Sequence, residues 1–157
     1  MKKLQLKDIV GYLPYRLKFF NDGGSEEDDT IYEIQGLSTF YGVEYSLSNG
    51  CGTCEHIECI KPILRPLSDL TKPIKVEGYN EGEEFVPIVK LNTIFNYIES
   101  IYIFFNDYKL QIEFDKGECN SHTIWANVIQ LLYQWHFDIN GLCDRGLAID
   151  MNTLITE

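Results

Sequence analysis

The spacing of apolar residues is the feature that most constrains the fold of this chain. Residues 15–19 and 43–47 alternate polar with apolar side chains, which is the period of a half-buried strand. Residues 124–135 instead place apolar side chains at the three- and four-residue intervals of an amphipathic helix. Turn residues separate segments of the two kinds, and no internal repeat joins them. The spacing therefore predicts an α+β fold.

The first part of the chain is predicted to be rich in strands. A leading helix is expected over residues 6–13 and should end at Pro14, because the residue before a proline avoids the helical region. Four strands are expected to follow, over residues 15–19, 30–37, 43–47 and 54–60. Asn49 and Gly50 tolerate positive φ and should turn the third strand into the fourth. We expect an antiparallel β meander or a small barrel behind the helix.

Two prolines interrupt the segment that comes next. Pro62 and Pro66 lack a backbone N–H, so they are expected to exclude both a helix interior and a central strand from residues 61–70. We interpret this segment as an extended connector. Residues 75–84 are polar and predict a hairpin tip or an exposed loop. That loop suggests a β-rich lobe over 1–74 and an α+β lobe over 75–157, unless the chain forms one continuous domain.

The second lobe is predicted to combine a β-hairpin with helices. Helical spacing covers residues 89–100 and could continue beyond them, but β-branched and aromatic composition favours a strand over 101–105. Clean alternation over 108–114 supplies its partner. Ser121 or Thr123 can cap the clearest helix, which should extend to about Phe137. The chain is then expected to make a helical turn over 140–145 and a tail strand over 147–151.

Composition and charge narrow the class of function. The chain has 157 residues, 45% of them hydrophobic, which is ordinary for a globular protein. Its formal net charge of −11 disfavours direct binding to nucleic acid or to anionic lipid. The N-terminus lacks the apolar stretch of a signal peptide, and five cysteines without such a peptide fit a reducing compartment. We therefore expect a cytoplasmic protein without a membrane span.

The densest group of chemically active residues lies at 51–59. Cys51, Cys54 and His56 are candidate zinc ligands, because a C-x2-C turn followed by a histidine supplies soft donors at short spacing. Strand alternation places Cys59 on the opposite face, so the fourth ligand would be distant, such as Cys119 or His122. The alternative interpretation is plain strand cysteines with no cofactor. A redox function is weaker, because reactive pairs of this kind begin a helix.

Two further segments contain side chains capable of chemistry. His136 and Asp138 lie near the end of the last helix, where a structural histidine is the simpler interpretation than a catalytic one. The acidic segment 22–29 lacks the alternating oxygen ligands of a calcium loop and is expected to be a solvated loop. No nucleophile elbow, P-loop or dinucleotide fingerprint is present in the sequence. The sequence thus offers no coherent catalytic set.

Several stretches of the chain resemble one known group of proteins. They are Tyr12-Leu13-Pro14-Tyr15, the run from Ile60 to Thr71, Trp135-His136-Phe137-Asp138 and the run from Gly146 to Leu154. Together they resemble small hypothetical proteins carried by phages and prophages of gut Bacteroides-like bacteria. The resemblance implies an accessory protein of a mobile element that acts inside a bacterial cell. It implies no catalytic or binding residue.

These observations support three hypotheses about function. The first is a non-enzymatic phage or prophage accessory protein that binds a host or phage protein, marked by exposed Tyr or Phe rimmed by carboxylates. The second is an acidic DNA mimic that inhibits a DNA-binding enzyme, which requires carboxylates in rows at phosphate spacing. The third is a small zinc-binding module built on Cys51, Cys54 and His56. An enzyme is the least supported class.

Overall fold

The computed structural model describes most of the chain and divides it into two compact units. The described residues are 3–21, 30–38, 42–47, 50–99, 101–106, 109–114 and 121–154. Unit 1 comprises Met1–Pro66 and Leu132–Glu157, and unit 2 comprises Leu67–Leu131. This division differs from a boundary after residue 74, because the C-terminal segment packs with the N-terminal strands. The acidic segment 22–29 and Asn49 lie outside the described residues.

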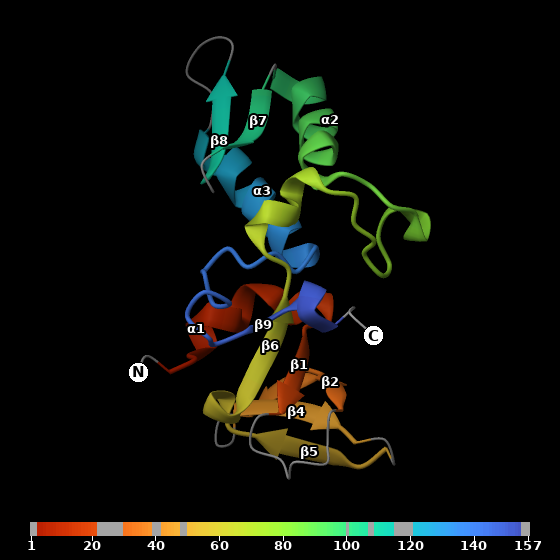
Figure 1. The fold of residues 1–157 in the computed structure, drawn as a ribbon, viewed down its shortest axis with the longest axis vertical. Coiled ribbons are helices and arrows are strands. Elements are labelled where there is room, and N and C mark those ends of the chain that lie inside the picture. The colour runs from red at the N-terminus through yellow and green to blue at the C-terminus, as the bar shows by residue number, and fades with distance from the viewer. Residues whose placement is uncertain are drawn as a thin grey trace. The chain divides into compact units, whose positions relative to one another are not determined.

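The architecture confirms the α+β class, the leading helix and the C-terminal hairpin with helices (Figure 1). Unit 1 begins with α1 (Leu6–Ile9), which continues as the 3₁₀ helix η1 (Val10–Tyr15). The helical segment therefore passes through Pro14 instead of ending before it. It ends at Arg16, whose φ of 59° is left-handed. Proline fits the 3₁₀ turn in its backbone angle, because its φ is fixed at about −65°, within the range of a 3₁₀ helix.

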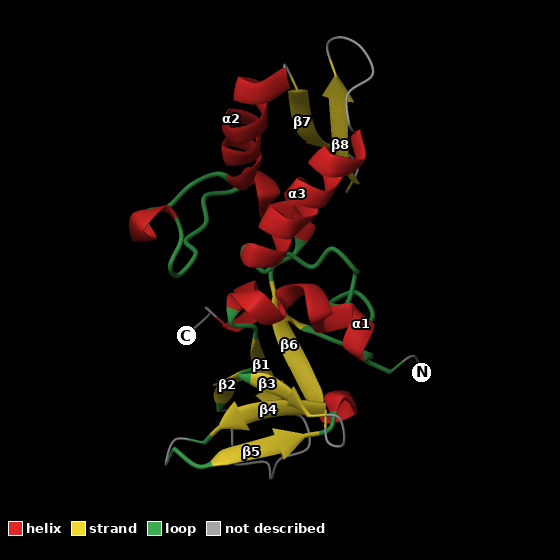
Figure 2. Ribbon diagram, turned by 180° about the vertical axis from the view of Figure 1, so that it is seen from behind, coloured by secondary structure: helices red, strands yellow, loops and turns green. Residues whose placement is uncertain are grey.

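The strands of unit 1 are divided between two sheets (Figure 2). The first has the order β2-β1-β6-β9, from β1 (Lys18–Asn21), β2 (Ile31–Glu33), β6 (Ile60–Leu64) and β9 (Ile149–Asp150). The second has the order β3-β4-β5, from β3 (Gly36–Ser38), β4 (Gly42–Ser46) and β5 (Gly52–Glu55). The strand expected over 30–37 is thus split into β2 and β3. The helical turns η2 (Ile57–Cys59) and η5 (Met151–Leu154) follow β5 and β9.

The prediction that the prolines exclude a central strand is wrong for Pro62. It lies in β6, which pairs antiparallel with β1 on one side and parallel with β9 on the other. Pro62 is opposite Phe19, and the pairing with β9 begins only at Ile63. Pro62 deprives the sheet of one backbone N–H donor. The burial of Ile60, Ile63 and Leu64 in the core stabilises the strand and offsets this loss.

Unit 2 joins two helices to a two-stranded sheet. The 3₁₀ helix η3 (Leu67–Thr71) precedes a polar loop closed by paired hydrogen bonds between Ile74 and Phe85, and this loop contains η4 (Asn80–Gly82). Helix α2 (Pro87–Glu99) packs on β7 (Ile101–Asn106), which pairs with β8 (Lys109–Phe114). Helix α3 (Ser121–Gln134) follows, and its end from Leu132 belongs to unit 1. The predicted loop, hairpin and both helices are confirmed.

Each unit has its own set of buried apolar side chains. In unit 1 the fully buried residues include Ile9, Tyr12, Leu17, Phe19 and Leu64. In unit 2 the buried residues include Leu70, Leu91, Phe95, Ile103 and Val128. Within the described part of the chain, every helix is too short or too polar to cross a bilayer.

Candidate functional site

The three predicted zinc ligands lie along one exposed edge of unit 1. Cys51 precedes β5, Cys54 lies within it opposite Glu44, and His56 follows the strand. All three side chains are exposed. Among the residues that the structure describes, no group of three or more His, Cys, Asp or Glu side chains is placed to hold a metal ion. Cys119, a candidate fourth ligand, lies outside them, and His122 belongs to unit 2.

His136 and Asp138 have separate partners and do not form a catalytic pair. The His136 ring donates through Nε2 to the carbonyl oxygen of Tyr15, at 2.7 Å. Asp138 is 6% exposed, and its carboxylate accepts the backbone N–H groups of Leu142 and Cys143, each at 2.8 Å. Burial lowers the pKa of His136 and keeps the ring neutral near neutral pH. Both side chains therefore serve as hydrogen-bonding anchors for the C-terminal segment.

The surrounding contacts complete this buried polar network of unit 1. Arg65 N–H donates to His136 O at 2.8 Å, and Asp138 N–H donates to Arg65 O at 2.7 Å. The Tyr12 hydroxyl donates to Phe137 O at 2.7 Å, and burial raises the pKa of that hydroxyl. Backbone from 136–138 is thereby held to β6 and to η1. The network explains why the segment Trp135-His136-Phe137-Asp138 is structural.

Cys143 is unsuited to nucleophilic chemistry. Burial, together with the nearby Asp138 carboxylate, raises the pKa of its thiol to about 12. A thiol with that pKa is protonated at neutral pH, and the thiolate is the reactive form.

The surface feature that stands out in unit 2 is one face of the β7–β8 hairpin. Side chains alternate across a strand, so Tyr102, Phe104 and Asn106 share a face. Their cross-strand partners Glu113, Gln111 and Lys109 complete it. We call these six residues the hairpin face. Ile103, on the opposite face, is 2% exposed.

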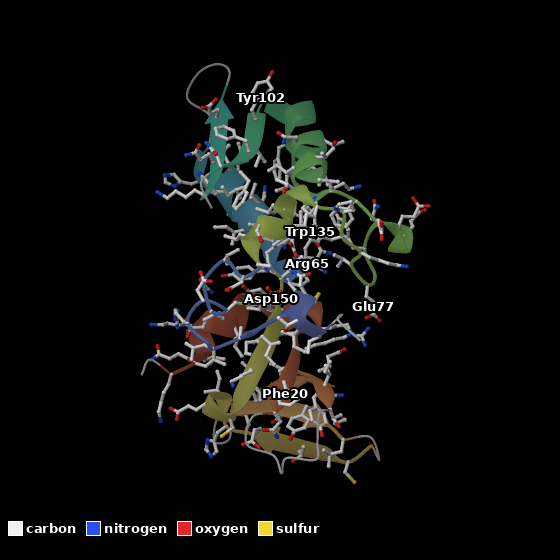
Figure 3. All side chains as sticks on the ribbon, viewed as in Figure 1. Phe20, Arg65, Glu77, Tyr102, Trp135 and Asp150 are labelled. Atoms are coloured by element: carbon white, nitrogen blue, oxygen red, sulfur yellow. The ribbon has the colours of Figure 1, made fainter. Side chains whose placement is uncertain are left out.

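The hairpin face exposes aromatic surface within a polar rim. Tyr102 is 52% exposed, and its side chain projects outward from β7 (Figure 3). Glu113 lies directly opposite it, and Phe104 next to it on the face is half-buried. A second exposed apolar spot exists in unit 1, where Leu6 and Val10 are 46% and 51% exposed. That spot has two aliphatic side chains and no aromatic one, so the hairpin face is the better candidate for binding.

Sequence reasoning identified the hairpin but not its exposed face. The run from Ile101 to Phe105 is apolar at every position, so alternation does not indicate which side chains face the solvent. The exposed face is indicated by the other strand, where the polar residues Lys109, Gln111 and Glu113 alternate with apolar ones. Pairing the two strands in register would have placed Tyr102 beside Glu113.

The fold and its contacts define an α+β protein with a structural buried polar network and an exposed aromatic sheet face. The chain matches no protein-family model, no curated protein and no solved structure.

Proposed function

We propose that this chain is a non-enzymatic accessory protein of a phage or prophage that acts by binding another protein in the bacterial cytoplasm. The hairpin face is the contact surface. The partner presents an apolar or aromatic patch with at least one basic side chain. The observation that carries the proposal is the 52% exposure of Tyr102 beside the carboxylate of Glu113.

The chemistry of the hairpin face suits a protein partner. Tyrosine and phenylalanine are enriched at protein interfaces because they bury a large area with few rotatable bonds. The tyrosine hydroxyl also offers a hydrogen bond at the wet rim. A net charge of −11 over the chain favours encounter with a basic partner and disfavours phosphate backbones. The separate anchoring of His136 and Asp138 supports a non-enzymatic role.

A matched pair of variants tests the hairpin face. Tyr102→Ser removes the exposed ring, and Leu37→Ser alters a control residue that is 40% exposed on β3 in unit 1. We expect immobilised wild type and Leu37→Ser to retain the same protein from an infected or induced bacterial culture. Tyr102→Ser should lose that protein.

The captured protein is then purified, and its affinity for each variant is measured by calorimetry. Truncation of a central aromatic residue typically costs about 2 kcal/mol or more, which is about a 30-fold loss in affinity. Equal affinity for Tyr102→Ser and wild type would exclude the hairpin face as the contact.

A further inference from the structure

The two edges of the β7–β8 hairpin differ in their backbone hydrogen bonds. Asn92 of α2 donates through Nδ2 to Ile103 O at 2.6 Å, and its Oδ1 accepts the Ile103 N–H at 2.7 Å. The side-chain amide thus occupies the outer edge of β7 in the manner of a neighbouring strand. A further strand is excluded from this edge at Ile103.

The same contact fixes the direction of the backbone groups in β8. Because both groups of Ile103 point to Asn92, the pair Ile103 and Ile112 is a non-hydrogen-bonded pair of the antiparallel ladder. In such a pair each residue directs its N–H and C=O away from the other strand. The N–H and C=O groups of Ile112 and, two residues earlier, Leu110 therefore point to the outer edge of β8.

The outer edge of β8 has no neighbouring strand within the described part of the chain. There, β8 pairs with β7 and with no other strand. An open edge of this kind is a template for another strand, because its N–H and C=O groups are already aligned. The residues of β8 determine which strand pairs best with this edge.

The sequence of β8 is complementary to itself. We infer that β8 pairs antiparallel with β8 of a second copy of this chain, in a register centred on Gln111. Lys109 then lies opposite Glu113 of the second copy, and the two-fold axis repeats this pair at the other end. Leu110 lies opposite Ile112 of the second copy.

The hydrogen-bonding phase of the ladder agrees with this register. Leu110 and Ile112 are the residues whose backbone groups point outward, and the register makes them a hydrogen-bonded pair across the two copies. Gln111, whose backbone groups point to β7, falls at the non-hydrogen-bonded centre. If the pairing slipped by one residue, Leu110 would lie opposite Gln111 of the second copy, and outward-directed backbone groups would face inward-directed ones.

The local charge also favours a second copy. Residues 101–114 carry Asp107, Lys109 and Glu113, so the net charge of the hairpin sequence is −1 in a chain of net charge −11. Two copies meet least repulsion where each is nearly neutral. The result is a continuous sheet of order β7-β8-β8-β7 that carries two copies of the hairpin face.

Charge reversal tests the register. Lys109 and Glu113 are exposed, and their partners in the hairpin are the uncharged Asn106 and Tyr102. Lys109→Glu and Glu113→Lys each turn two attractive pairs of the dimer into two repulsive ones. We expect each single variant to raise the dimer dissociation constant by about 10- to 100-fold, and the double variant to restore it.

A mixture of the two single variants provides a further test of the register. Mixed in equal amounts, Lys109→Glu and Glu113→Lys should form a mixed dimer in which both charge pairs are attractive. Sedimentation velocity from about 10 μM to 1 mM measures all five samples, with circular dichroism to confirm that each variant is folded. Wild-type protein that stays monomeric over this range, or a double variant that does not recover, would overturn the inference.

Amide hydrogen exchange by NMR gives a second readout. In the dimer the N–H groups of Leu110 and Ile112 should exchange slowly, and dilution should make them exchange faster. The Gln111 N–H, which points to β7, should be insensitive to dilution. Uniform exchange behaviour along β8 at all concentrations would contradict the pairing.

The inference goes beyond the proposed function and can fail separately from it. Lys109 and Glu113 belong to the hairpin face and contribute to both proposals, but only partner binding depends on the Tyr102 ring. Tyr102→Ser should leave the dimer dissociation constant within about twofold of wild type. A dimer without partner capture would overturn only the proposed function, and capture by a monomer would overturn only the pairing of β8.

Discussion

Gly11 leaves space for an aromatic ring. A Cβ atom built on Gly11 would lie 2.3 Å from the nearest atom of the Tyr133 ring, which also packs edge-on against Tyr12 at a centroid distance of 4.6 Å. We expect Gly11→Ala to lower the free energy of unfolding by about 1–3 kcal/mol, because the ring has to move out of a packed position. Urea unfolding measures this change.

The control for this substitution is Gly52→Ala in β5. Among the described residues other than its two chain neighbours, none has an atom within 4 Å of a Cβ built on Gly52. Its free energy of unfolding should stay within about 0.5 kcal/mol of wild type. Equal stability of Gly11→Ala and wild type would contradict the packing of Tyr133 on η1.

His136 makes the stability of the protein depend on pH. Burial lowers its folded-state pKa below the ordinary value of 6.5, so at mildly acidic pH the unfolded state binds a proton that the folded state does not. The free energy of unfolding should therefore fall as the pH decreases through 6.5.

His136→Asn tests this contribution. The φ of His136 is 59°, a left-handed backbone conformation that asparagine tolerates. The asparagine side chain does not titrate in this pH range. The loss of stability between about pH 7.5 and pH 5.5 should be smaller in this variant than in wild type. His122→Asn, at an exposed position of α3, is the matched control and should keep the wild-type profile. An unchanged profile in His136→Asn would exclude the ring as its source.

At the scale of elements, Asn92 joins α2 to β7. Its amide bonds both backbone groups of Ile103 and also donates to Ile88 O at 2.9 Å. Asn92→Ala leaves the Ile103 N–H without its acceptor, and we expect a loss of about 1–3 kcal/mol in the free energy of unfolding. The Ile103 amide should also exchange faster in NMR measurements.

Thr93→Ala is the matched control on the same helix. Thr93 is exposed, and its hydroxyl donates to Val89 O of the same helix at 2.9 Å. Its removal should change stability by less than about 0.5 kcal/mol. If the two variants lose equal stability, the amide does not act as a link between helix and strand.

The elements that the sequence predicted correctly are those with local signals. Periodicity predicts α2, β8 and α3, and β-branched and aromatic composition predicts β7, because each helix or strand pair is formed from neighbouring residues. Local preference does not predict the strand at Pro62, because the partners of β6 lie far away in the chain, at residues 19–21 and at Ile149 and Asp150. Such pairing overrides the local preference of a proline. Likewise, nothing in the helical pattern of α2 indicates that Asn92 bonds a strand.

At the scale of the whole molecule, unit 1 depends on residues near the C-terminus. Leu142 and Ala148 are buried in its core cluster, and β9 pairs with β6. A chain ending after Gly146 lacks Ala148 and β9. We expect it to lose about 3 kcal/mol or more in the free energy of unfolding of unit 1, measured by urea titration.

A chain ending after Thr153 provides the control. It keeps β9 and the hydrogen bond from Thr153 to Asp150 O, and it removes Leu154, which is 43% exposed. Its unfolding should match that of wild type. Comparable loss in both truncated chains would contradict a specific contribution from β9 and Ala148.

The interrupted chain path of unit 1 has a consequence for biosynthesis. Residues 67–131 of unit 2 are contiguous, whereas unit 1 needs both residues 1–66 and residues 132–157. A ribosome releases the chain from its N-terminus, so β1 and β6 emerge long before Asp138 and β9 are made. Unit 2 can complete its contacts while unit 1 still lacks its last strand. During translation, the β9 side of β6 therefore stays without its partner strand until the chain is nearly complete.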